Sequence, residues 1–191
     1  MFEYIIPSKT RRKILSLYFN DVTQIYHLRK VAREVKEEIN AVKRELDILE
    51  KEGVLKKEKR VNRVIFYINP KYLFHDELLR IFTKQNTLCQ GILKNASRLG
   101  KIKFAVISLK FLKKQKIQEG ELFLLLVGTI VVPEIANLIA EEEKASGSEI
   151  NYTVMTDEEF AFRKKSNDPF IWSFLRQPKL MIVGDEGGLT A

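Results

Sequence analysis

The chain has 191 residues, of which 45% are hydrophobic, so wholesale disorder is excluded and one large or two small packed domains are allowed. The net charge of +8 is uneven: residues 1–100 carry 21 basic against 12 acidic side chains, and residues 101–191 carry 12 against 13. A polyanionic partner is therefore expected for the first half only, although a basic face that is simply solvated gives the same charge pattern.

Three helices are predicted in the first half of the chain. Ser8 is a good N-cap for a helix over residues 8–19, and a second helix is predicted over residues 27–35. The link over residues 36–38 is short, and two helices joined so closely are typical of a helix-turn-helix. The third helix ends at Gly53, and its inward stripe consists of Ile39, Val42, Leu46 and Leu49.

A basic β-hairpin is predicted to follow the third helix. Residues 54–55 begin a strand, residues 56–63 form a basic turn, and residues 64–69 form a return strand that Pro70 ends. The predicted turn concentrates positive charge, with five cations in eight residues: Lys56, Lys57, Lys59, Arg60 and Arg63.

The second half has a different pattern. A longer helix is predicted over residues 76–99, and it is more apolar than one packing face requires, which favours a second copy of the chain as a partner. From residue 101 strands alternate with helices, which predicts a small α/β domain with a mixed or parallel sheet. Residues 185–191 are expected to be a frayed tail.

The exposed face of the third helix and the hairpin have the side chains that duplex binding needs, namely cations for phosphates and short polar groups for base edges. Asn40 is expected to pair with adenine or a phosphate, Lys43 and Arg44 to reach guanine or the backbone, and Ala41 to touch a thymine methyl group. The other residues predicted to bind DNA are cations of the second helix, the link and the hairpin: Arg29, Lys36, Lys57, Lys59, Arg60 and Arg63. Glu37 and Glu38 favour the helix dipole but would repel phosphate.

The segments YHLRKVAREV and INAVKRELDILEKEGVL, followed by the basic hairpin, resemble the winged helix-turn-helix transcriptional regulators of the ArsR/MarR-like type over residues 8–69. The resemblance implies a sequence-specific DNA-binding regulator. Its recognition helix would enter the major groove, and its wing would contact the backbone or the minor groove. It also implies a dimer on a palindromic site.

Residues 101–184 are similar to the minimal nucleotidyltransferase-like domain. Active members have a Gly-Ser pair after the first strand and two carboxylates at the start of the second strand, which bind metal ions for phosphoryl transfer. Ile107-Ser108-Leu109 lacks that glycine, and Glu121-Leu122-Phe123 retains one of the two carboxylates. These departures predict that the chain has no catalytic residues and is not an enzyme.

The predicted fold class is α+β. It has a winged helix-turn-helix domain over residues 1–72, a linker or dimerisation helix over 73–99, and a nucleotidyltransferase-like α/β domain over 100–191. Two histidines and the single Cys89 do not make a four-ligand zinc site, so no metal and no cofactor is predicted.

Double-stranded DNA and a second copy of the chain are the expected partners, and an effector stays open. One cysteine and the absence of an apolar run of roughly 18 residues indicate a cytoplasmic protein with no membrane partner. A nucleotidyltransferase-type enzyme and an antitoxin-like interaction module are the alternative functions.

Overall fold

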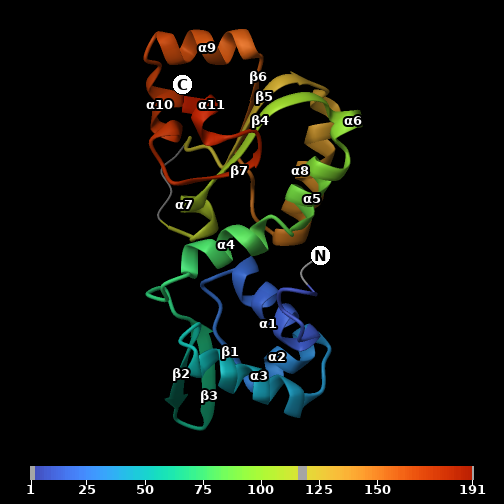
Figure 1. Cartoon of the computed structure of the whole chain (residues 1–191), viewed down its shortest axis with the longest axis vertical. Coiled ribbons are helices and arrows are strands. Elements are labelled where there is room, and N and C mark those ends of the chain that lie inside the picture. The colour runs from blue at the N-terminus through green and yellow to red at the C-terminus, as the bar shows by residue number, and fades with distance from the viewer. Residues whose placement is uncertain (1–2, 116–119, 191) are drawn as a thin grey trace. The chain divides into compact units, whose positions relative to one another are not determined.

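The computed structural model describes residues 3–115 and 120–190 (Figure 1). The chain divides into two compact units, Met1–Thr83 and Lys84–Ala191, which are called the first and the second unit below. Each unit contains helices and one β-sheet, so the fold is mixed α and β, in agreement with the predicted α+β class.

The first unit begins with helices and ends with a helix that follows its sheet. Its elements are α1 (Lys9–Asn20), β1 (Tyr26–His27), α2 (Leu28–Val35), α3 (Ile39–Lys51), β2 (Leu55–Arg60), β3 (Arg63–Ile68) and α4 (His75–Thr83).

The core of the first unit lies where α1, α2 and α3 meet the sheet. Ile14 of α1, Val31 of α2 and Leu46 of α3 are completely buried, as the predicted helical spacing requires. Tyr18 is also buried, and its hydroxyl donates to the Phe66 carbonyl of β3 at 3.1 Å. The role of Ser8 as an N-cap is confirmed, since its hydroxyl oxygen accepts from the Arg11 N–H at 3.2 Å.

The hairpin of the first unit is tighter than the sequence predicted. The strand order is β1-β3-β2 with antiparallel pairing, and Arg60 lies directly opposite Arg63. The basic turn predicted over residues 56–63 is therefore wrong in extent, because the strands include all of these residues except Val61 and Asn62. Val61 has a φ of 36°, and a positive φ at the first central residue is typical of the hairpin turns that fit strand twist.

The single helix predicted over residues 76–99 is instead three helices, because asparagine side chains interrupt it. After α4 ends, the side-chain oxygen of Asn86 accepts from the Cys89 N–H at 2.8 Å and so begins a new helix. Asn95 follows the end of that helix, and its side chain donates to the Gly91 carbonyl at 2.9 Å. Most of the apolar side chains that suggested a dimer are buried in the cores of the two units, although Leu93 stays 44% exposed.

The second unit is built around a four-stranded sheet. Its elements are α5 (Thr87–Lys94), α6 (Ala96–Leu99), β4 (Gly100–Ser108), α7 (Leu109–Leu112), β5 (Leu124–Ile130), α8 (Val132–Ser146), β6 (Tyr152–Met155), α9 (Asp157–Lys165), α10 (Pro169–Leu175), β7 (Lys179–Val183) and α11 (Glu186–Thr190).

The sheet of the second unit is mixed, which is one of the two arrangements that the sequence predicted. Its order is β6-β5-β4-β7, with β4 antiparallel to both of its neighbours and β5 parallel to β6. Successive residues of β4 point to opposite faces. Phe104 and Val106 pack with residues of α9, α10 and α11, including Phe160 and Ile171. Helices α5 and α8 cover the other face (Figure 1).

Cys89 and the C-terminal residues both contribute to the core of the second unit. Cys89 is fully buried, and burial raises its pKa to about 12. The frayed tail predicted over residues 185–191 is wrong for residues 186–190, which form α11 and bury Leu189 in the core. Ala191 lies outside the described residues.

No helix in the described part of the chain is long and apolar enough to cross a membrane.

Candidate nucleic-acid interface

Helix α2 begins at a histidine cap and ends in a sharp reversal. The ring nitrogen Nδ1 of His27 accepts from the Lys30 N–H at 3.2 Å and so caps the helix. At the other end Lys36 has a left-handed conformation with φ 53° and ψ 51°. This residue turns the chain at once into α3, so that the link between the two helices is short even without a glycine.

The N-terminus of α3 is closed by an acidic side chain. The carboxylate of Glu38 accepts from the N–H groups of Asn40 at 2.8 Å and of Ala41 at 2.9 Å. These hydrogen bonds lower the pKa of Glu38. Two of the amide groups that the helix would offer to an external anion are thus already bound to the carboxylate of Glu38.

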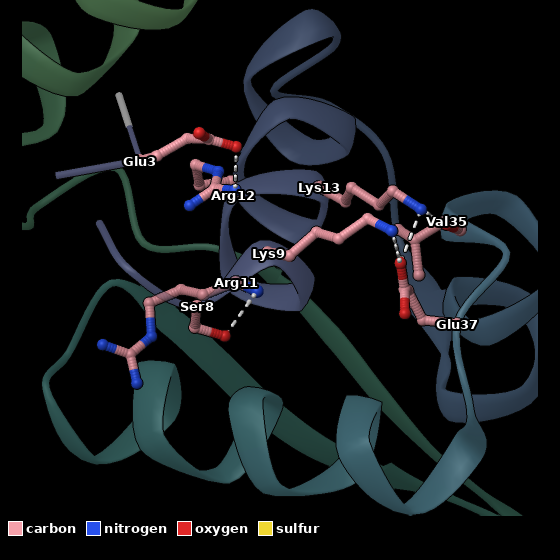
Figure 2. Close-up of polar contacts among 8 residues, drawn as sticks. All are labelled: Glu3, Ser8, Lys9, Arg11, Arg12, Lys13, Val35 and Glu37. Carbon is pink, nitrogen blue, oxygen red and sulfur yellow. Dashed lines mark hydrogen bonds and ion pairs between the residues drawn. The ribbon is translucent and has the colours of Figure 1, made fainter. Parts of the chain in front are cut away.

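The neighbouring acid, Glu37, is neutralised from α1. Figure 2 shows Lys9 and Lys13 pointing from α1 toward the Glu37 carboxylate. The Lys13 ammonium lies 2.6 Å from this carboxylate and 2.9 Å from the Val35 carbonyl, which it also binds. The hydrogen bond from Lys13 is the main reason why the pKa of Glu37 is lowered. The expected repulsion of phosphate by this residue is therefore offset within the fold.

The predicted binding residues of α2, the link and α3 lie at the surface. Five of the six are exposed, and the sixth, Ala41, is half-buried. The exposed residues are Arg29, Lys36, Asn40, Lys43 and Arg44. Val42, Leu46 and Leu49 of α3 are buried as predicted. The side chains that would read a duplex and those that pack α3 into the core thus lie on separate faces of this helix.

The hairpin cations lie on two faces, because residues opposite each other in the register project to the same side. Lys57 lies opposite the buried Phe66, and its ammonium reaches Asp47 of α3 at 3.3 Å. Lys59 projects to the same face two residues further along. Arg60 and Arg63 project to the other face.

Arg60 and Arg63 place two like charges directly opposite each other at the end of the hairpin, an arrangement that is unfavourable by itself. Glu58 compensates Arg60 through a hydrogen bond of 2.8 Å, which lowers the pKa of the Glu58 carboxyl. Arg63 and Lys59 form no ion pair with any described residue. The tip of the hairpin therefore keeps uncompensated positive charge.

A groove of about 590 Å³ separates the N-terminal ends of α2 and α3 from the tip of the hairpin. Seven residues line it: His27, Leu28, Arg29, Ile39, Asn62, Arg63 and Val64. Two of the predicted binding residues, Arg29 and Arg63, lie in this groove. Leu28, Ile39 and Val64 contribute apolar side chains to this groove, and Arg29 and Arg63 contribute cations.

Sequence reasoning missed the apolar part of this groove. Ile39 was assigned to the buried stripe of α3, but it is 39% exposed and lines the groove. Val64 was assigned to a strand without a role, and it is 38% exposed opposite Lys59. Periodicity alone gives no signal for either, since both fit the pattern of a packed residue.

The two motif positions of the second unit are held by neighbouring side chains. Ser108 is completely buried, and its hydroxyl donates to the side-chain oxygen of Gln177 at 3.0 Å. The Glu121 carboxylate accepts two hydrogen bonds from the Lys110 ammonium, at 2.6 and 2.7 Å. Phe123 packs edge-on against Phe111 with ring centroids 5.3 Å apart. The pairing of Glu121 with Lys110 was not foreseen.

No protein-family model matches the chain, and no curated protein matches it. A solved structure that matches is that of human N-acetylserotonin methyltransferase in complex with SAM, with 18% sequence identity and a TM-score of 0.30. The match covers 50% of this chain and 32% of that chain, so this chain spans about a third of the methyltransferase.

This comparison corrects one prediction. The sequence predicted that the chain is not an enzyme, whereas the matched protein is a methyltransferase solved with SAM. We therefore withdraw that prediction. A TM-score of 0.30 carries no argument for methyl transfer, or for any other activity, in this chain.

Proposed function

We propose that this chain is a cytoplasmic, sequence-specific DNA-binding transcriptional regulator of the winged helix-turn-helix type. The order of elements in the first unit supports this proposal: helix, short strand, helix, helix and hairpin, with β1 paired to β3. In this proposal α3 is the recognition helix and the β2–β3 hairpin is the wing. Three residues separate α2 from α3, which suits the tight turn of such a motif.

The observation that carries the proposal is the concentration of exposed, unpaired cations on α2, α3, the link between them and the hairpin. Within the described ranges, nine exposed cations of these elements form no ion pair: Arg29, Arg33, Lys36, Lys43, Arg44, Lys51, Lys56, Lys59 and Arg63. A polyanion lowers the repulsion among such charges, and phosphate contacts supply much of the affinity of DNA-binding proteins.

The contacts are proposed to divide into affinity and specificity. Glu38 occupies the first amides of α3, so phosphate binding depends on side chains rather than on that helix terminus. Lys59 and Arg63 would bind phosphates beside the groove. Asn40 and Arg44, on the exposed face of α3, would reach base edges in the major groove.

The salt dependence of binding to duplex DNA tests the affinity part. Fluorescence anisotropy of a labelled duplex should show log affinity falling steeply with log salt concentration. Lys59→Ala and Arg63→Ala should each reduce the slope by about 0.9, the amount for one phosphate contact. Lys94→Ala removes an exposed cation of α5 in the second unit and should leave the slope unchanged. Binding that is insensitive to salt and to both hairpin variants would rule out the proposal.

Selection of bound duplexes from a random library tests the specificity part. A conserved pattern should emerge among the selected duplexes, and Asn40→Ala should relax it at one position, with a cost of about 1–3 kcal/mol at that base pair. A palindromic pattern would indicate that two copies of the chain bind together. Selection without any preferred sequence would exclude a sequence-specific regulator.

A further inference from the structure

Helix α9 presents a large apolar side chain to solvent. Phe162 is 71% exposed, although Phe160 of the same helix is buried in the core of the second unit. With 3.6 residues per turn, four residues share the face that points away from the core. All four are exposed: Glu158, Ala161, Phe162 and Lys165.

The other charged residues of α9 are engaged within their own unit. Arg163 contacts Glu159 at 2.9 Å and Asp168 at 2.8 Å. Asp157 lies 3.6 Å from Lys103 of β4, and Lys164 donates to the Leu189 carbonyl at 3.0 Å. These contacts tie the sides and the inner face of the helix to the rest of the unit.

The outward face of α9 carries one charge of each sign. Glu158 lies in the first turn, where its carboxylate binds Thr156 and its own N–H group but stays exposed. Lys165 lies seven residues further along and forms no ion pair with a described residue. Because seven residues span about two turns, the two charges lie on one line with Ala161 and Phe162 between them.

We propose that α9 packs antiparallel against α9 of a second copy of the chain. A two-fold axis midway between Glu158 and Lys165 passes between Ala161 and Phe162. Glu158 then meets the partner's Lys165, and the same contact recurs on the other side of the axis. Phe162 packs against the partner's Ala161, so a large side chain faces a small one at both positions.

Self-complementarity is the reason for choosing a second copy as the partner. The face has no net charge, so it offers nothing to a polyanion such as DNA or to an anionic lipid surface. The acid and the base are placed symmetrically about an apolar centre, which is what an isologous contact requires. The apolar residues of 76–99 are the other surface considered for dimerisation, and most of them are buried in the cores of the two units.

The energetic roles of these residues differ. Exposed ion pairs contribute little affinity, so the Glu158–Lys165 contacts are expected to set the antiparallel orientation. Phe162 is expected to provide most of the affinity through burial. A helix of nine residues buries less area than a standard interface, so the dissociation constant should lie in roughly the micromolar range.

Sedimentation velocity of the full chain over about 1 to 300 μM, a range that brackets this affinity, tests the contact. The wild type should dimerise, and Phe162→Glu should weaken the dimer roughly tenfold or more. Phe74→Glu changes another exposed phenylalanine, in the first unit, and should leave the dimer intact. A wild type that stays monomeric, or that dimerises equally well as Phe162→Glu, would overturn the proposal.

Charge exchange tests the antiparallel geometry. Glu158→Lys and Lys165→Glu alone each set like charges against each other twice, so each should weaken the dimer roughly threefold to tenfold. The double variant restores opposite charges and should recover most of the wild-type affinity. Failure of the double variant to recover, with both single variants folded and weakened, would reject the antiparallel arrangement. These measurements use no DNA, so their outcome is independent of the proposed regulatory function.

Discussion

Glu37 and Glu38 are adjacent in the sequence but bind different parts of the fold. Glu38 closes α3 through two amide hydrogen bonds, whereas Glu37 reaches back to Lys13 of α1. Both contacts favour the charged carboxylate and lower its pKa. Two acids that the sequence suggested as a barrier to phosphate therefore stabilise the turn between α2 and α3.

The link of Glu37 to Lys13 predicts how stability depends on pH. A carboxyl whose pKa is lowered below its ordinary value of 4.5 stabilises the fold above that value, and the stabilisation is lost as the pH falls through the lowered pKa. Glu37→Gln should therefore lower the urea midpoint at about pH 7 and match the wild type at about pH 2. Glu50→Gln changes an exposed acid of α3 that has no ion pair among the described residues, and it should follow the wild type at both pH values. A deficit of Glu37→Gln that persists at low pH would contradict this account.

Val61 at the tip of the hairpin is an unusual residue for its backbone. It has a φ of 36° and is 93% exposed, so its branched side chain packs against nothing that compensates for the strain. A left-handed conformation costs an L-residue roughly 1–2 kcal/mol, and glycine avoids most of this cost.

Val61→Gly should therefore raise the free energy of unfolding by about 0.5–1 kcal/mol, after the entropy lost by glycine is subtracted. Val64→Gly provides a control in which the free energy of unfolding should fall. Val64 lies in the extended strand β3, where glycine destabilises the protein. Urea unfolding of both variants measures the difference. Equal destabilisation by the two changes would show that Val61 is not strained.

At the scale of the element, short polar side chains decide where helices end. Apolar residues recur through residues 76–99, and this recurrence suggested one helix. Asn86 begins α5 and Asn95 ends it, by hydrogen bonds to the backbone at 2.8 and 2.9 Å. Both residues are in the sequence, but caps compete with a helical periodicity that continues through them.

The close approach of β4 and β5 requires a glycine at position 128. Gly128 has a φ of 141°, and a Cβ at this position would collide with the Lys101 carbonyl. Gly128→Ala should lower the free energy of unfolding by about 3 kcal/mol or more, because backbone atoms rather than a flexible side chain must move. Thr129→Ala, at the exposed neighbouring position, should change it by less than about 1 kcal/mol. Thermal and urea unfolding compare the two variants, and an equal loss of stability would refute the steric argument.

At the scale of the whole molecule, the division of the chain falls at Thr83 rather than at the predicted boundary of residue 72. Helix α4 belongs to the first unit because Phe82 stacks on Phe19 of α1, with ring centroids 5.6 Å apart. Leu79 of α4 is completely buried as well. Through these residues α4 packs on α1 within the core of the first unit.

Two fragments test this boundary. Residues 1–83 should unfold cooperatively, because the core of the first unit is complete in this fragment. Residues 1–72 should be less stable by about 4 kcal/mol or more, since burial of Leu79 and Phe82 is lost. Urea unfolding followed by circular dichroism compares them. Equal stability of the two fragments would place α4 outside the fold of the first unit.

The sequence anticipated the candidate site in part. Of the ten residues predicted to contact DNA, nine are exposed and Ala41 is half-buried, because short helices with a clear apolar stripe leave their polar faces outside. The groove was not predicted. Its residues come from α2, α3 and the hairpin, and no local pattern indicates that Ile39 and Val64 meet across it.

The sequence by itself determined the local features of this protein: the first three helices, the basic hairpin, the alternation of strands and helices in the second half and the uneven charge. Each follows from residues close together in the chain, where periodicity, capping and turn chemistry act. The tertiary structure decided which charges are neutralised, as in the pairs Glu37–Lys13, Asp47–Lys57 and Glu121–Lys110. It also decided where the chain divides and that Phe162 stays exposed. These features depend on contacts between distant segments, and the free energy of such contacts is set by packing that no single segment encodes.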